Sequence, residues 1–93
     1  MKISVIIPCF NESNTIISIL KKVNLEKEKF NLEIIISDDG STDNTVKNTV
    51  NSLKASQNIS LLVHKKNYGQ SASLLTGITN AKYEHIVLSL IHI

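Results

Sequence analysis

Four short apolar runs leave this chain few possible folds. They are rich in isoleucine, valine and leucine and span Ile3–Ile7, Leu32–Ser37, Ile59–Val63 and Ile86–Leu88. Each run is nearly continuous rather than alternating, which is typical of strands whose two faces are both buried in a parallel sheet. The first is expected to stop at Pro8, because proline has no N–H to give to a neighbouring strand.

Between these runs the apolar residues fall at helical spacing. The first predicted helix covers Ser13–Val23, with Ser13 or Asn14 as its N-cap, and the charged segment "LEKEKFN" is expected to be a connection. A third helix is predicted over Gln70–Thr79. The second helix should be capped by Asp43 and carry three apolar residues on one face, namely Val46, Val50 and Leu53.

Alternating strands and helices predict the α/β class, with a parallel sheet in the middle of three layers and helices on both of its faces. At 93 residues the chain is one domain or part of one. The fourth strand begins close to the last residue, so we expect an unfinished sheet.

Composition narrows the class of protein further. A formal net charge of +2 gives no electrostatic reason to expect a nucleic-acid partner. One cysteine, Cys9, suits a reducing compartment. Neither a secretory signal nor an apolar run long enough to cross a bilayer is visible. The sequence therefore favours a protein of the cytoplasm or of the cytoplasmic face of a membrane.

Polar residues follow each of the first three predicted strands, as "PCFNE", "SDDGSTD" and "HKKNYGQS". In an open parallel sheet, ligands bind beyond the carboxyl ends of the strands. Side chains alternate in direction along a strand, so the neighbouring acids Asp38 and Asp39 should point to opposite sides. One can then face a ligand while the other holds backbone amides.

Other interpretations of the acidic segment remain open. It can be a turn followed by a helix cap, since Asp, Gly and Ser are common turn residues. The spacing Asp39-x-Ser41-x-Asp43 also suits a cation loop, although the distal glutamate of an EF-hand is absent. A phosphoacceptor receiver domain is excluded, because its acid pair follows the first strand, where this chain has "PCFNE".

Three elements in order resemble the N-terminal half of the family 2 glycosyltransferases, which have the GT-A fold. These elements are "SVIIPCFNE", "EIIISDDGSTDNT" and "NYGQSASLLTGITNA", and the resemblance runs to about Leu88. It implies a partial nucleotide-sugar-binding domain over 1–88. Within the family, the chain looks most like the enzymes that transfer a sugar to dolichyl or undecaprenyl phosphate.

The resemblance also implies which residues bind the nucleotide-sugar. Asp39 would accept a hydrogen bond from an N–H of the base, while Asp38 would steady the loop or the ribose end. Glu12 would accept from ribose hydroxyls or cap the first helix. The other implied residues are the base-side pair Pro8 and Phe10 and the helix-start pair Asn67 and Gln70. Phe10 suits core packing equally well.

This chain departs from the family where an acidic D-x-D element should follow the fourth strand. That element holds a divalent metal, Mg²⁺ or Mn²⁺, on the donor pyrophosphate. Here the sequence reads "IVLSLIHI", with no carboxylate. We therefore expect no metal ligand and no catalytic residue in this chain, and we interpret residues 89–93 as an aberrant or truncated tail. His64, His85 and His92 are expected to be structural or surface residues.

The hypothesis from sequence has two parts. The parent protein is a hexosyltransferase-type enzyme that moves a sugar from a UDP- or GDP-sugar to an acceptor, such as a polyprenyl phosphate in a membrane. The 93-residue chain keeps part of the donor-nucleotide site and is inactive alone. The alternatives are a non-enzymatic nucleotide- or metal-binding α/β module and a purely structural fragment.

Overall fold

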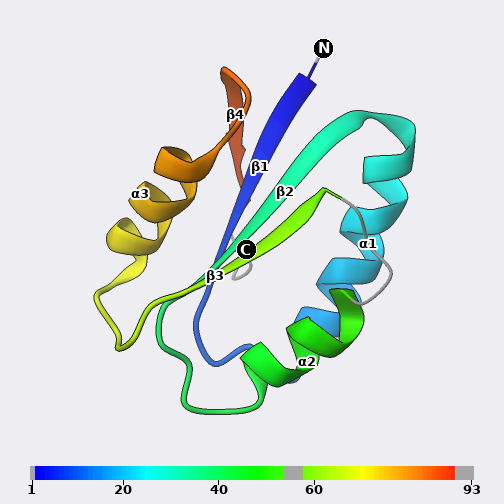
Figure 1. The fold of residues 1–93 in the computed structure, drawn as a ribbon. Coiled ribbons are helices and arrows are strands. Elements are labelled where there is room, and N and C mark those ends of the chain that lie inside the picture. The colour runs from blue at the N-terminus through cyan, green and yellow to red at the C-terminus, as the bar shows by residue number, and fades with distance from the viewer. Residues whose placement is uncertain (1, 54–57, 90–93) are drawn as a thin grey trace.

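The structure is a computed structural model that describes residues 2–53 and 58–89, apart from the side chains of residues 24 and 26–29. Strands and helices alternate along the chain (Figure 1), as β1 (Lys2–Cys9), α1 (Ile16–Lys29), β2 (Asn31–Asp38), α2 (Thr45–Leu53), β3 (Ile59–Val63), α3 (Gln70–Asn80) and β4 (His85–Leu88). Of the predicted tail, only Ser89 lies among the described residues; it donates its N–H to Ile6.

The four strands form one parallel sheet in the order β3-β2-β1-β4. Helices α1 and α2 cover one face and α3 covers the other, so the predicted three-layer α/β architecture is confirmed (Figure 1). The chain builds outward from β1 to β3 and then crosses back, through α3, to the other side of β1. The strand order therefore reverses beside β1, which is where open parallel sheets place their ligands.

The core lies around the two central strands. Ile6, Ile7 and Ile34–Ile36 are almost completely buried. On the side of α1 and α2, Ile7, Ile34 and Ile36 pack with Ile16 and with other apolar residues. Each fully buried aliphatic side chain contributes about 1.5–3 kcal/mol to folding, so these strands fix the frame that carries the polar strand ends.

Strand β1 continues two residues past the predicted stop and includes Pro8. Its pairing with β4 covers only Ile3–Ile6, whereas its pairing with β2 runs on to Cys9. The carbonyl of Ile6 points toward β4, where it accepts the N–H of Ser89. Backbone groups two residues apart in a strand point to the same side, so the nitrogen of Pro8 also faces the β4 side, beyond the residues that pair with β4. A proline is tolerated here because no ladder bond is lost.

Helix α1 starts and ends later than predicted. The predicted caps, Ser13 and Asn14, lie in a turn before it, and the N–H groups of Thr15 and Ile16 donate instead to the carbonyl of Glu12. The segment predicted as a charged connection is helical as far as Lys29. Leucine, glutamate and lysine are strong helix formers, which explains the extension.

Of the face predicted to be buried in helix α2, Leu53 does pack against the core, but the most buried residues of the helix are others. Its fully buried residues are Thr45 and Thr49, while Val50 is half exposed. The hydroxyl of Thr45 accepts the N–H of Glu12 at 2.7 Å, and that of Thr49 donates to the carbonyl of Thr45 at 2.8 Å. These hydroxyls can be buried because their hydrogen bonds are satisfied.

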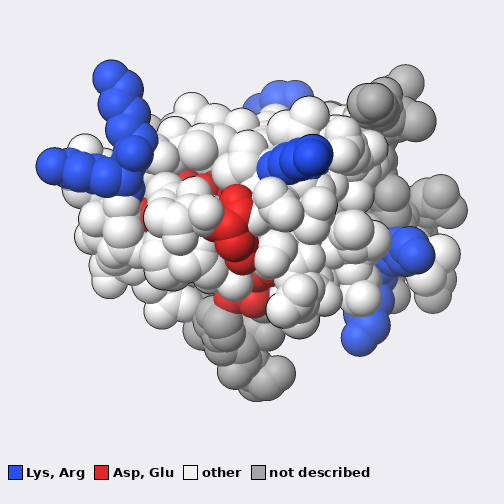
Figure 2. Space-filling model, turned by 90° about the horizontal axis from the view of Figure 1, so that it is seen from below, with Lys and Arg blue, Asp and Glu red and all other residues white. Residues whose placement is uncertain are grey.

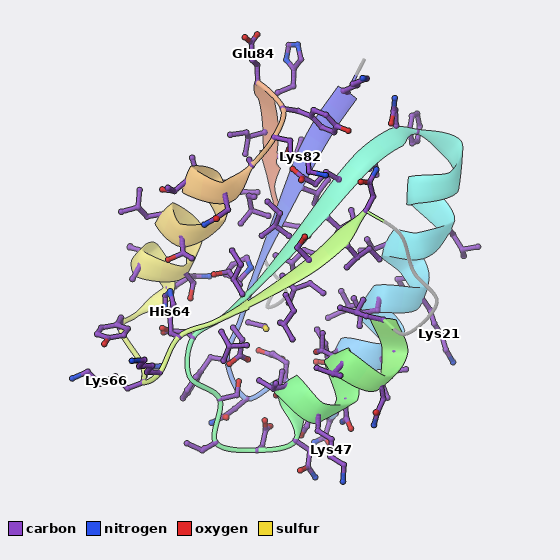
Figure 3. All side chains as sticks on the ribbon, viewed as in Figure 1. Lys21, Lys47, His64, Lys66, Lys82 and Glu84 are labelled. Atoms are coloured by element: carbon purple, nitrogen blue, oxygen red, sulfur yellow. The ribbon has the colours of Figure 1, made fainter. Side chains whose placement is uncertain are left out.

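A buried carboxylate ties the end of α3 to the sheet. Glu33 in β2 accepts hydrogen bonds from the hydroxyl of Ser4 at 2.7 Å and from the N–H of Lys82 at 2.9 Å. The side chain of Lys82 lies 3.8 Å from the same carboxylate (Figure 3). These contacts lie at the end of the sheet opposite the polar strand ends and are structural.

Strand β4 lies at one edge of the sheet, and its apolar side chains are partly exposed. Ile86, Val87 and Leu88 are all between one-third and one-half exposed. From the sequence, the apolar residues Leu90 and Ile91 are also expected to extend this edge, but they lie outside the described residues. None of the described helices has both the length and the apolar character needed to cross a membrane.

An exposed strand edge of this kind promotes association. We expect Val87→Lys to raise, by several-fold, the protein concentration at which oligomers appear in sedimentation velocity. Ile17→Lys is the matched control, because it adds the same charge at an exposed apolar residue on helix α1. Equal effects of both variants would show that net charge, rather than the β4 edge, controls association.

Candidate functional site

A pocket of about 340 Å³ opens at the carboxyl ends of the strands. It lies beside β1, at the reversal of the strand order. Its walls come from the ends of β1 and β2 and from the start of α3, and they comprise Pro8, Cys9, Phe10, Asp39, Asn67, Gly69, Gln70 and Ser73. Five of the predicted site residues are thus brought together; Glu12 and Asp38 are not among the lining residues.

Asp39 connects all three strand ends. Its N–H donates to the carbonyl of Cys9 at 2.9 Å. Its carboxylate accepts the N–H of Tyr68 at 2.9 Å and the N–H of Gly69 at 2.7 Å. His64 at the end of β3 lies 2.8 Å from the same carboxylate. Asp39 therefore faces the pocket while it fixes the β3–α3 loop.

Its environment keeps Asp39 ionised. The side chain is buried, which by itself opposes ionisation. The N–H of Tyr68, the ring of His64 and the N–H of Gly69 outweigh that burial, so the pKa of Asp39 lies below its ordinary value. The pocket therefore presents a fixed negative acceptor at neutral pH.

Asp38 points the other way and is completely buried. Its carboxylate accepts the N–H of Ser41 at 2.9 Å and the hydroxyl of Ser41 at 2.5 Å. These bonds hold the turn in which Gly40 has a φ of +73°. The two neighbouring acids thus point to opposite sides of the strand, one to the pocket and one to the loop.

The turn after β2 is also bonded to the turn after β1. The side-chain carbonyl of Asn11 accepts the N–H of Thr42 at 2.8 Å, and the N–H of Asn11 donates to the hydroxyl of Ser41 at 2.9 Å. Asp43 caps α2 as predicted, accepting the N–H of Thr45 at 2.9 Å. Hydrogen bonds from Thr45 lower the pKa of Asp43 to about 2. These hydrogen bonds join the two turns into one rim.

Glu12 belongs to this rim rather than to the pocket wall. It is buried, and its carboxylate accepts the hydroxyl of Thr15 at 3.0 Å, just before α1. The side chain of Glu12 thus bonds to a hydroxyl at the start of the helix, while the backbone carbonyl of Glu12 accepts the first N–H groups.

The remaining predicted residues lie near the mouth of the pocket. Phe10 is 38% exposed, and Asn67 and Gln70 are exposed at the start of α3. Lys65 and Lys66 are both exposed, and Lys66 points away from the fold, with its ammonium 5.5 Å from the ring centre of Tyr68 (Figure 3). Seen from the carboxyl ends of the strands, acidic groups form a central band, and most of the lysines project toward the margins (Figure 2).

Two further candidates are a reactive thiol at Cys9 and a cation site in the loop Asp39–Asp43, and the contacts of the described residues support neither. Burial, with the nearby Asp38, raises the pKa of the Cys9 thiol far above its ordinary value, so the sulfur is a neutral thiol. Asp39 and Asp43 make separate contacts instead of converging on one point. Within residues 2–53 and 58–89 there is no cluster of three or more His, Cys, Asp or Glu side chains able to hold a metal ion.

Sequence reasoning missed the contact between His64 and Asp39. His64 was expected to be structural or on the surface, and it is structural: its ring lies 2.8 Å from both Asp39 and Thr76 of α3. Figure 3 shows His64 between the end of β3 and α3. The available signal was its position, directly after the third strand. Gly69 and Ser73, which also line the pocket, fall within the predicted turn and helix.

Residues 4–89 match the family model described as glycosyl transferase family 2. An uncharacterized glycosyltransferase of Rickettsia conorii is 44% identical over 85 residues, which is 91% of this chain and 14% of that protein. The undecaprenyl-phosphate 4-deoxy-4-formamido-L-arabinose transferase of Proteus mirabilis is 29% identical, over 92% of this chain and 27% of its own length. The chain thus spans a minor part of these relatives.

Solved structures agree with the fold. Crystallised residues 1–349 of S. aureus TarS superpose with a TM-score of 0.81 at 26% identity, covering 97% of this chain and 27% of that one. A mannosyltransferase from Pyrobaculum calidifontis, solved with GDP-Man and Mn²⁺, superposes with a TM-score of 0.85 at 23% identity, over 95% and 26% of the two chains. The described sheet and helices therefore form part of a GT-A fold.

Proposed function

This chain belongs to glycosyl transferase family 2, and we propose that its pocket is part of the donor-nucleotide site of a sugar-transferring enzyme. The observation that carries the proposal is the position of Asp39. An ionised carboxylate lines a pocket at the reversal point of a parallel sheet, next to Pro8 and the ring of Phe10. A carboxylate only accepts hydrogen bonds, so it suits an N–H on the edge of a base.

The donor in this proposal is a UDP- or GDP-sugar. Its base lies between Phe10 and Asp39, and its phosphates extend toward Asn67 and Gln70, where the first N–H groups of α3 can meet an anion. Glu12 and Asp38 support the rim from behind the pocket. The acceptor is a polyprenyl phosphate, an assignment that rests on the name of the Proteus mirabilis relative.

The divalent metal that the family implies does not fit the side chains described here, since they contain no suitable cluster. We assign no residue of this chain to it. The chain spans about a quarter or less of the relatives and structures reported above. The proposal is therefore that residues 1–88 hold part of the nucleotide site and that the 93-residue chain transfers no sugar by itself.

Phe10→Ala tests the base-binding part of this proposal. Stacking of a base on an aromatic ring is worth about 1–3 kcal/mol, so the variant should weaken UDP or GDP binding by roughly five- to 150-fold. Phe10 is partly exposed, so its removal should change the free energy of unfolding by less than about 1 kcal/mol. Isothermal titration calorimetry measures the affinity, and urea unfolding measures the stability.

Phe30→Ala is the matched control, because Phe30 is also exposed but lies just before β2, at the other end of the sheet. It should leave nucleotide affinity unchanged. If Phe10→Ala bound UDP and GDP as tightly as the unaltered protein, Phe10 would not contribute to nucleotide binding. Sugar transfer by the 93-residue chain would contradict the proposed inactivity.

A further inference from the structure

We infer that the pocket selects a base with a single N–H on its pairing edge, a uracil rather than a guanine, and that His64 is the residue that imposes this choice. The inference rests on the proposed function and names the class of donor within it. It follows from how many hydrogen bonds the Asp39 carboxylate already accepts.

A carboxylate offers about four acceptor positions, two on each oxygen. Oδ1 of Asp39 accepts the N–H of Tyr68 at 2.9 Å and faces Nδ1 of His64 at 2.8 Å, so both of its positions are used. Oδ2 accepts the N–H of Gly69 at 2.7 Å. One position, on Oδ2, is left for a ligand in the pocket.

His64 occupies Oδ1 whatever its protonation state. Because Nδ1 faces a carboxylate oxygen, that nitrogen carries a proton and donates it. Nε2 lies 2.8 Å from the hydroxyl of Thr76, which can donate to a neutral ring or accept from a charged one. The ring is only 13% exposed and packs edge-on against Tyr68, with 5.5 Å between ring centres. The second position on Oδ1 is therefore closed.

The two candidate bases differ in the number of donors they bring. Guanine presents N1–H and an N2–H side by side, which match a carboxylate with one free position on each oxygen. Uracil presents one N–H between two carbonyls. At this site the second donor of guanine would meet an oxygen that already holds two donors, and it would lose its hydrogen bond on leaving water. Uracil brings no second donor to this edge, so no N–H of the base is left unpaired there.

The test measures the dissociation constants of UDP and GDP for the 93-residue chain from amide proton–nitrogen correlation spectra, which detect millimolar binding. A hydrogen bond to a charged group is worth about 1.5–3 kcal/mol, so UDP should bind at least about tenfold more tightly than GDP. UDP methylated at N3 lacks the N–H on its pairing edge, so it should bind at least about tenfold more weakly than UDP.

His64→Ala should open the closed position and reduce the preference for UDP to about threefold or less, mainly through a gain in GDP affinity. His85→Ala, at an exposed histidine of β4, is the matched control and should keep the preference of the unaltered protein. Should His64→Ala not fold, His64→Val removes the ring N–H that Asp39 accepts while keeping a residue suited to a strand end, and it should also narrow the preference.

The outcomes separate this inference from the proposed function. GDP binding as tightly as UDP, or methylated UDP binding as tightly as UDP, would overturn the inference while leaving a nucleotide site. An unchanged preference in a folded His64→Ala variant would remove His64 from the account. If neither nucleotide shifts any pocket amide, both the inference and the proposed function fail.

Discussion

Asp39→Ala is expected to lower the free energy of unfolding by about 3–5 kcal/mol and to abolish nucleotide binding. The variant leaves the N–H groups of Tyr68 and Gly69 without their acceptor and removes the carboxylate partner of His64. It also removes the acceptor proposed for the base. Urea unfolding followed by circular dichroism measures the first effect, and calorimetric titration with UDP measures the second.

Asp43→Ala is the control for a lost acid on the same loop. Asp43 is exposed and caps α2, so its loss should cost only about 1 kcal/mol and should not change nucleotide affinity. An Asp39→Ala protein that is as stable as Asp43→Ala would show that the contacts between Asp39 and the β3–α3 loop contribute little to folding.

Low pH should reproduce, in the unaltered protein, part of the loss in the free energy of unfolding that is expected for Asp39→Ala. The pKa of Asp39 is lowered in the folded chain, so its ionised form stabilises the fold fully above its unfolded pKa of about 3.9. That stability is lost as the pH falls toward the lowered folded value. The urea midpoint should therefore drop more steeply below pH 4 in the unaltered protein than in Asp39→Asn, which cannot titrate there.

Gly40→Ala is the second change with a large expected effect, about 3–4 kcal/mol of lost stability. A Cβ at residue 40 would lie 2.5 Å from the carbonyl carbon of Lys66 and 2.8 Å from the backbone nitrogen of Asn67. Those atoms are backbone and cannot move without displacing the β3–α3 loop. The φ of +73° adds strain for any residue with a side chain.

Two further variants separate the steric effect from the strain. Gly69 has a φ of +104°, but its added Cβ would meet no described atom within 4 Å, so Gly69→Ala should cost only about 1–2 kcal/mol. Asparagine tolerates a positive φ, so Gly40→Asn would recover stability if strain alone were responsible. We expect no recovery; a near-normal urea midpoint for Gly40→Asn would contradict the close approach of the two loops.

The sequence predicted the sheet and the convergence of its strand ends because both follow from simple rules. Continuous isoleucine runs indicate strands buried on both faces, and parallel strands bring their carboxyl ends to one edge. From this, the proximity of Phe10, Asp39 and Asn67 could be expected, and the pocket contains all three. Asp38 and Asp39 point to opposite sides for the same reason, the alternation along a strand.

Other features depend on contacts between distant segments and could not be predicted. The buried face of α2 is set by the hydroxyl of Thr45, which bonds to Glu12, 33 residues earlier. The partner of His64 depends on the path of the β3–α3 loop, which Gly40 allows to approach closely. Local spacing carries no information about either contact.

The most direct test of the proposed donor-nucleotide site is a map of UDP contacts from amide proton–nitrogen correlation spectra of the unaltered protein. We predict that the shifted amides cluster at the carboxyl ends of the strands and the start of α3, at Phe10, Asp39, Gly69, Gln70 and Ser73. Amides at the opposite end of the sheet, at Asn31 and His85, should not move. Shifts centred on Asn31 and His85, or no shifts at saturating UDP, would contradict the account.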